Sequence, residues 1–188
     1  MRVTKAQAQA NRAHIVETAA RLFRERGYDG VGVADLMAAA GFTHGGFYKH
    51  FKSKADLMAE AAACGFAQSM QASADSDPAS FVEHYLSREH RDEPGAGCTL
   101  AALGGDAARQ SENVKATFAI GIERMLADLA TAQTSLDEAE QRELRSVRIQ
   151  CMAQMMGALM LSRACPDDSP LADEILEVCR TRVLAQLA

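Results

Sequence analysis

The sequence is poor in proline and in aromatic residues, and it lacks the patterns that mark β-strands. Four of its 188 residues are proline, and aromatic residues make up 5%. Alanine is abundant, and no run alternates Val, Ile, Thr or aromatic residues with polar ones. Because alanine favours helices whereas β-branched and aromatic residues favour strands, the composition predicts an all-α fold. The length suffices for a buried core without metals or disulfides.

Long apolar runs are also missing. No stretch of 18 apolar residues is present, and charged residues interrupt the N-terminal region. The sequence therefore predicts neither a membrane-spanning helix nor a signal peptide. The cysteines form no CxxC pair and are odd in number; they are Cys64, Cys98, Cys151, Cys165 and Cys179. This spacing favours reduced thiols in a cytoplasmic protein over a disulfide framework.

Motifs of common enzyme classes are absent as well. The chain has no G-x-S-x-G elbow, no phosphate loop and no H-E-x-x-H helix, so we expect no catalysis. The histidine pairs His44/His50 and His84/His90 are six residues apart, whereas two ligands on one helix face need a spacing of four. We therefore expect neither a metal nor a cofactor. A thiol-dependent dyad of Cys98 and His90 is the remaining enzymatic alternative.

The charge is divided unevenly along the chain. Residues 1–54 carry nine Lys or Arg and four Asp or Glu, whereas the rest carries 11 basic and 21 acidic residues. The net charge of -5 thus hides a basic N-terminal end and an acidic remainder. A basic end of this kind is typical of a surface that binds the phosphates of DNA.

Residues 33–51, VADLMAAAGFTHGGFYKHF, have the pattern of a helix-turn-helix. Val33, Leu36, Met37 and Ala40 share one helix face, which must be buried. Gly41 suits the left-handed position after that helix, and the next helix would span residues 44–51, capped by Thr43. In such a unit the second helix enters the major groove of DNA.

Helical spacing continues on both sides of this motif. Further helices are expected over residues 4–26, 54–73 (capped by Ser53), from Pro78, over 99–109, from Val114 to about Gln133, and over 137–164 and 170–187. The chain should have about nine helices. We divide it into a three-helix DNA-binding domain, residues 1–52, and an effector-binding and dimerisation domain, residues 53–188.

The polar side chains of the second motif helix are candidates for base contacts. His44, Lys49 and His50 offer hydrogen-bonding groups beside Thr43. Phe47 and Phe51 should point into the core, and Tyr48 outward. Gly45 and Gly46 are unfavourable inside a helix. They either allow the backbone to approach DNA closely or leave the helix short and frayed until it binds.

The two C-terminal helices carry apolar residues on more than one face, which favours self-association over burial within a monomer. The candidate interface residues are Val147, Cys151, Met156, Ile175, Val178 and Val183.

Methionine and aromatic residues on the central helices are candidates for an apolar ligand pocket, because methionine adapts its shape to varied ligands. They are Phe66, Met70, Tyr85, Phe118, Met125 and Met155, with Cys98 beside them. Ordinary core filling is the alternative for each methionine.

Cys98 follows a glycine-rich segment and precedes a predicted helix. A helix N-terminus stabilises a thiolate, so Cys98 is a candidate sensor of an oxidant or electrophile. The alternative is a small apolar residue packed under a glycine turn.

These residues resemble the tetracycline-repressor (TetR/AcrR) family of bacterial regulators. The resemblance covers Ile15 to about Leu57, with the core AAGFTHGGFYKHFKSKADL, and the THGGFY run resembles one subset of the family. Residues 90–109, HRDEPGAGCTLAALGGDAAR, resemble an effector-domain motif of that subset. The family implies an all-α homodimer that binds operator DNA and is released by an inducer.

The resemblance also implies phosphate contacts from Tyr48 and Lys54. Gly32 stands where many members carry Ser or Thr, so at the start of the first motif helix, Gly32 and Val33, only backbone N–H groups could meet a phosphate.

We therefore expect a bacterial, cytoplasmic transcriptional repressor that binds a pseudo-palindromic operator as a homodimer. Its release would follow binding of a small apolar ligand or modification of a thiol. The alternatives are a transcriptional activator of the same fold and, from another class, a thiol-dependent enzyme.

Overall fold

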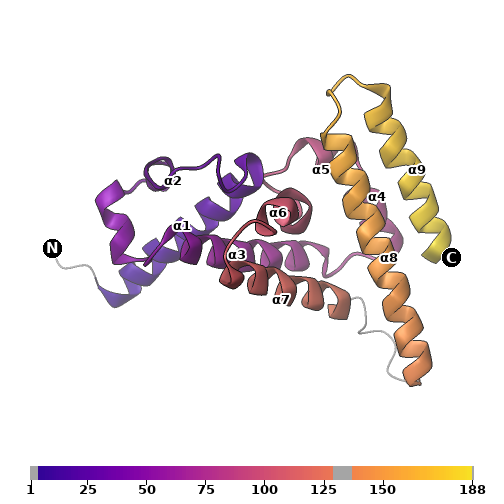
Figure 1. Cartoon of the computed structure of the whole chain (residues 1–188), viewed down its shortest axis with the longest axis horizontal. Helices are drawn as coiled ribbons and strands as arrows, with labels where there is room; N and C mark the ends of the chain where they lie inside the picture. Colours follow the sequence, from indigo (N-terminus) through magenta and orange to yellow (C-terminus); the bar gives the residue numbers. More distant parts are fainter. Residues whose placement is uncertain (1–3, 129–136, 188) are drawn as a thin grey trace.

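The computed structural model describes residues 4–128 and 137–187. This part of the chain folds into ten helical segments and contains no β-strand (Figure 1). The all-α fold expected from the composition is therefore confirmed. None of the described helices is long and apolar enough to cross a membrane.

The N-terminal helices begin and end as the sequence predicts. In α1 (Lys5–Arg26), the Thr4 hydroxyl accepts from Gln7 N at 3.2 Å, and Gly27 follows with φ at 71°. Helix α2 (Val33–Ala39) ends before Gly41, whose φ of 79° is the left-handed conformation expected after that helix. The predicted core face of α2 is confirmed by Leu36 and Met37, which are buried.

The second motif helix differs from the prediction. Instead of an α-helix over residues 44–51, the chain forms a short 3-10 helix, η1 (His44–Lys49). Thr43 stands at its N-cap but its side chain makes no capping hydrogen bond. The low helix propensity of Gly45 and Gly46 accounts for the shorter, tighter helix.

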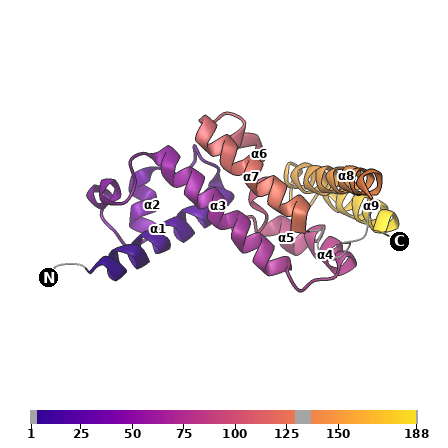
Figure 2. The ribbon, with the colours of Figure 1, turned by 90° about the horizontal axis from the view of Figure 1, so that it is seen from below.

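Helix α3 (Lys54–Ser73) connects the N-terminal helices to the rest of the molecule (Figure 2). Ser53 caps it as predicted, since its hydroxyl accepts from Asp56 N at 3.1 Å. It packs against α1 on one side and against α7 (Glu112–Asp128) on the other. The predicted end of that last helix, near Gln133, lies outside the described residues.

Three short helices fill the middle of the chain. Pro78 starts α4 (Pro78–Tyr85) as predicted, and α6 (Thr99–Ala107) begins directly after Cys98. Between them lies a further helix that was not expected from the sequence, α5 (Arg88–Asp92). Ser87 caps α5, because its hydroxyl accepts from His90 N at 3.1 Å.

The two longest C-terminal helices stand side by side at the end of the molecule opposite α1 and α2 (Figure 1). They are α8 (Glu138–Arg163) and α9 (Pro170–Leu187). Their common face buries Leu159, Leu176 and Val183.

Candidate functional site

Two buried phenylalanines attach the second helix of the helix-turn-helix to the core. Phe47 and Phe51 are almost fully buried, and their ring centroids lie 5.5 Å apart. This confirms their predicted orientation. The Met37 side chain of α2 lies under η1, 3.5 Å from where a Cβ on Gly46 would be. The recognition segment, residues 43–50, is therefore held by side chains on its inner face.

Its outer face is open. Tyr48 is 69% exposed and stands edge-on to Phe47, with ring centroids 5.2 Å apart. Thr43, His44 and Lys49 are exposed as well. A Cβ on Gly45 would meet nothing within 4 Å, so the backbone itself lies bare at this point. Hydroxyl, imidazole and ammonium groups thus share one accessible surface with a bare backbone.

Arg12 of α1 supports the end of this segment, a role that the sequence did not suggest. Its guanidinium lies 4.7 Å from the Phe51 ring centroid, and its Nε donates to the His50 carbonyl at 3.4 Å. The same guanidinium pairs with Glu60 of α3. Together with α7 residues, these groups line an open depression of about 460 Å³. His50 is half-buried here, so it is less available for base contacts than predicted.

Lys54 is also less free than a phosphate-binding lysine would be. Its ammonium donates to the Tyr28 carbonyl at 2.6 Å and lies 6.0 Å from the Phe23 ring centroid. At the start of α2, Gly32 makes no side-chain cap, is exposed, and precedes a half-buried Val33. The first backbone N–H groups of α2 therefore remain available, as expected.

Residues 15–61 match the family model of bacterial regulatory proteins, tetR family. The N-terminal part of the chain is therefore similar to that of tetR-family regulators. The HTH-type transcriptional regulator AcrR of Shigella flexneri is 44% identical over 59 residues, which are 31% of this chain and 27% of that protein. The alignment thus spans about a quarter of the relative's length.

Solved structures of low sequence identity share the whole fold. The reduced form of NemR from E. coli has a TM-score of 0.72 at 19% identity, over 93% of this chain and 95% of that chain. AibR, solved in complex with isovaleryl coenzyme A and operator DNA, has a TM-score of 0.55 at 17% identity, over 92% and 97% of the two chains. The shared fold therefore extends to the C-terminal helices.

In the remainder of the chain, four of the predicted pocket residues lie in pairs. Phe66 of α3 packs edge-on against Phe118 of α7, with centroids 5.3 Å apart. Tyr85 of α4 faces Cys98 closely enough that the thiol contributes to its electrostatic surroundings. Met155 is buried, whereas Met70 and Met125 are half-buried.

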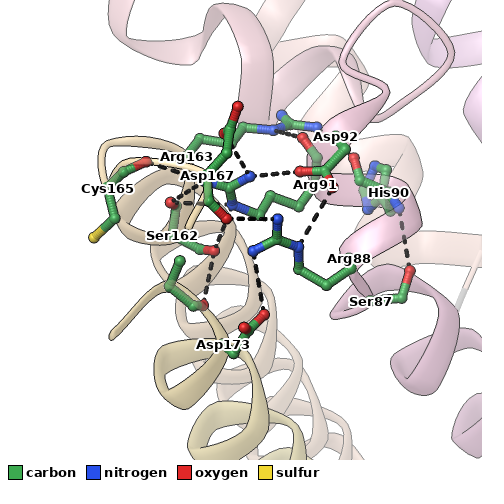
Figure 3. A network of polar contacts seen from close by, with 11 residues as sticks. Ser87, Arg88, His90, Arg91, Asp92, Ser162, Arg163, Cys165, Asp167 and Asp173 are labelled. Carbon is green, nitrogen blue, oxygen red and sulfur yellow. Dashed lines mark hydrogen bonds and ion pairs between the residues drawn. The ribbon is translucent and has the colours of Figure 1, made fainter. Parts of the chain in front are cut away.

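A network of arginines ties α5 to the end of α8 (Figure 3). Arg91 is buried and donates to the Ser162 hydroxyl at 3.0 Å and to the Cys165 carbonyl at 3.0 Å. Arg163 reaches back from α8, where Nε donates to the Arg91 carbonyl at 2.9 Å and Nη2 to the His90 carbonyl at 2.6 Å. Helix α5 and the end of α8 thus each donate hydrogen bonds to the other.

Arg24 connects the same region to the N-terminal helices. Its Nε donates to the Gly95 carbonyl at 2.8 Å, and its other nitrogens reach Thr99 and Gln68. Asp106 of α6 accepts from Tyr28 N at 3.0 Å. Helix α1 is therefore anchored directly to the glycine-rich segment 94–97 and to α6. Sequence analysis missed Arg24 and Arg163, because an arginine within a helix is usually solvated.

Cys98 lies at the N-cap of α6, as predicted, but it is 5% exposed. Its backbone N–H donates to His90 Nε2 at 3.1 Å. The thiol is therefore not a surface group. The His84 and His90 rings stack with centroids 6.0 Å apart, and no group of three metal-binding side chains occurs within residues 4–128 and 137–187.

One predicted interface residue is wrong. Val183 is fully buried between α8 and α9 within the protomer, because it faces the common side of the pair. Cys151, Met156 and Ile175 also pack partly against the protomer core, and Val147 is half-buried. Val178 remains, 54% exposed. Other exposed apolar side chains of α8 and α9 accompany it: Ile149, Met160, Leu161, Leu171 and Leu187.

Proposed function

We propose that this chain is a DNA-binding transcriptional repressor. The observation that carries the proposal is the outer face of residues 43–50, where Tyr48, Lys49 and His44 are exposed above two buried phenylalanines. Lys49 and His44 suit base edges or phosphates, and the Tyr48 hydroxyl suits a phosphate oxygen. Helix α2, whose N-terminal N–H groups are open, would lie across the DNA backbone. We propose repression and not activation because regulators of this family usually repress.

DNA binding with point variants tests this proposal. The full chain is titrated against duplexes selected from a random library, at several salt concentrations, by fluorescence anisotropy. Lys49→Ala should weaken binding and lower the salt slope by about one, since a phosphate or base contact is lost. Arg182→Ala, on α9 at the end of the molecule opposite α1 and α2, removes one positive charge from an exposed site and should leave affinity unchanged. Equal behaviour of the two variants would contradict the proposed surface.

Tyr48→Phe separates phosphate from base contacts. Loss of the hydroxyl should weaken binding to all selected sequences alike, by a few-fold. A change confined to one base position would contradict the phosphate role of Tyr48. The same comparison applied to Lys54→Ala tests whether its ammonium leaves the Tyr28 carbonyl to meet DNA.

We also propose that the protein acts as a homodimer with its boundary between domains near residue 52. The exposed apolar side chains of α8 and α9 support the dimer, because an exposed apolar patch on a helix pair is typical of an interface. Two recognition segments could then enter successive major grooves about 34–36 Å apart on a pseudo-palindrome.

Release would follow the binding of a small molecule in the effector core or modification of Cys98. The contacts of Arg24 with Gly95 support this coupling, since they join α1 to the core. Because Cys98 is buried, a reagent would have to open the segment before it. Alkylation of the native protein followed by mass spectrometry tests this route. Equal labelling of all five thiols, or no labelling of Cys98, would contradict release through modification of Cys98.

A further inference from the structure

A small polar site lies inside the otherwise apolar effector core, beneath Gly97. The Tyr85 ring of α4 stands edge-on to His90 with centroids 4.7 Å apart, and His90 Nε2 accepts from the backbone N–H of Cys98 at the start of α6. The Arg163 guanidinium of α8 lies beside Gly97, with Nη2 3.4 Å from where a Cβ on Gly97 would be. Tyr85 and Cys98 are each 5% exposed. Three elements distant in sequence thus bring a hydroxyl, a thiol and a guanidinium together.

Two of these groups have buried atoms without a partner. The Tyr85 hydroxyl and Arg163 Nη1 have no hydrogen-bond partner by distance and angle, and the group beside the hydroxyl is the Cys98 thiol, which hydrogen-bonds only weakly. Buried polar atoms are nearly always hydrogen-bonded, because an unpaired one costs free energy. Two such atoms from different helices close to one buried cation need an explanation, and a bound acceptor would supply it.

The charge at this site is positive and unbalanced. Arg163 uses Nε and Nη2 on two backbone carbonyls, and no carboxylate of the described residues lies within ion-pairing distance of it. Burial lowers its pKa, as expected for a cation removed from water. An anion that accepts from Nη1 would balance this charge.

His90 adds no second charge. Its Nδ1 lies 2.7 Å from the Tyr85 carbonyl and must donate, whereas Nε2 accepts from Cys98 N–H. These two contacts fix the neutral tautomer. The neighbouring charges of Arg91 and Asp92 pair with each other, which leaves Arg163 as the cation without an ion-pair partner. A monoanion therefore matches the site, whereas a phosphate dianion would bury a net negative charge.

We propose that Tyr85 and Arg163 bind the carboxylate of a small monocarboxylic acid whose apolar part lies among the core side chains. One oxygen accepts from Arg163 Nη1 and from the Tyr85 hydroxyl. This inference rests on the proposed function, and it names the chemical class of the effector.

The position of the site connects it to the DNA-binding domain. A Cβ on Gly97 would lie 2.6 Å from His90 Nε2 and 3.4 Å from Arg163 Nη2, so backbone and guanidinium are in close contact. The other side of the same segment is bound by Arg24 through Gly95. A carboxylate that draws Arg163 towards itself therefore acts on a segment to which α1 is attached.

Thermal unfolding and calorimetric titration of the full chain without DNA test this site. The probes are hexanoate, its neutral isostere hexanamide, and inorganic phosphate, at equal ionic strength. Hexanoate should bind in about the millimolar range, as expected for a ligand of its size, and raise the Tm. Hexanamide and phosphate should not. Equal binding of hexanamide, or no binding of hexanoate, would overturn the site.

Tyr85→Phe is the decisive variant, because it removes only an unpartnered hydroxyl. It should leave the Tm of the free protein unchanged or higher, and weaken hexanoate binding about tenfold, as for a lost hydrogen bond to a charged group. Tyr28→Phe is the matched control, since the Tyr28 hydroxyl is also buried and unpartnered but belongs to the DNA-binding domain. It should bind hexanoate normally. Equal affinity in both variants would overturn the role of Tyr85.

Arg163→Gln should abolish hexanoate binding. Because Arg163 also fastens α5, a lower Tm of this variant is expected, and Tyr85→Phe carries the test independently. Hexanoate binding is measured without DNA, so the two proposals can fail separately. A chain that binds a duplex but not hexanoate overturns only the carboxylate site, and one that binds hexanoate but no duplex refutes only the repressor.

Discussion

At the scale of single residues, buried polar groups in this protein connect distant segments. Arg24 and Arg91 each satisfy backbone carbonyls far away in the sequence. The number of basic residues in the sequence therefore overstates how much positive charge the proposed DNA-binding surface exposes. Of the nine basic residues in 1–54, Arg12 and Arg21 form ion pairs, and Arg24 is buried. The exposed Lys49 is therefore a better indicator of the proposed DNA contact than the summed charge of residues 1–54.

The buried His90 makes the fold sensitive to acid. Burial lowers its pKa below the ordinary 6.5, and the nearby Arg163 and His84 lower it further, while the Tyr85 carbonyl opposes them. The unfolded chain then takes up the proton at a higher pH than the folded chain. Stability is complete above about pH 6.5 and should be lost as the pH falls towards the folded pKa.

Urea unfolding at pH 7.5 and pH 5.5 checks this expectation. Because glutamine cannot take up a proton, His90→Gln should lose less unfolding free energy between pH 7.5 and pH 5.5 than the unmodified protein. Its stability at neutral pH should be lower. His84→Gln, at an exposed neighbour, should retain the loss. If His90→Gln keeps the full acid sensitivity, another group is responsible.

Gly45→Ala distinguishes the two explanations of the glycine pair. No atom lies within 4 Å of a Cβ at this position, so folding stability should stay the same or rise by up to about 1 kcal/mol. DNA affinity should fall several-fold if the bare backbone approaches DNA. Unchanged affinity would favour the frayed helix instead. Anisotropy and urea unfolding measure both quantities.

Gly41→Ala tests the backbone conformation, whereas Gly45→Ala tests the exposed backbone of the second motif helix. Space is open there too, but φ is 79°, so the backbone conformation itself is strained for alanine. This variant should lose about 1 kcal/mol of unfolding free energy.

At the scale of elements, the segment 94–97 is packed more tightly than its glycine-rich sequence implies. Gly95 approaches Glu25, and Gly97 approaches His90. The glycines are there because other groups occupy the space of a side chain. Flexibility is not required to explain them.

Gly97→Ala should therefore destabilise the fold by about 1–3 kcal/mol, as overpacking does. Gly105→Ala, on an open face of α6, should instead stabilise it by up to about 1 kcal/mol. Chemical unfolding of both variants gives the comparison. A neutral Gly97→Ala would mean that His90 moves freely, and it would weaken the proposed coupling through this segment.

At the scale of the whole molecule, α8 and α9 divide their apolar residues between two faces. One face closes the protomer with Leu176 and Val183, and the other leaves Val178 and Met160 exposed. An isolated protomer would leave this patch in water, which favours association.

A charge on the outer face should separate the proposed dimer. Val178→Glu is expected to halve the mass in solution while leaving the protomer folded, as measured by light scattering and circular dichroism. Ala116→Glu, on the exposed side of α7, should keep the dimer. Val183→Glu should unfold the protein, since it buries a charge. An unchanged mass for Val178→Glu would remove this interface.

The sequence by itself determined most of the helices and the outline of the N-terminal helix-turn-helix. Local signals sufficed for α1, α3 and the turn at Gly41, because caps and left-handed glycines act over a few residues. The inward Phe47 and outward Tyr48 also followed from spacing. The 3-10 form of η1 did not, because it depends on the weak propensity of two glycines held over Met37.

Only the tertiary structure decided which polar groups meet. Arg163 and Tyr85 are 78 positions apart, and nothing in their local sequence distinguishes them from solvated side chains. The inward direction of Val183 and the outward direction of Val178 likewise depend on where α9 meets α8. Helix periodicity states which residues share a face, but packing against distant elements decides which face is buried. That is why the recognition segment could be predicted from sequence, and the polar site beneath Gly97 could not.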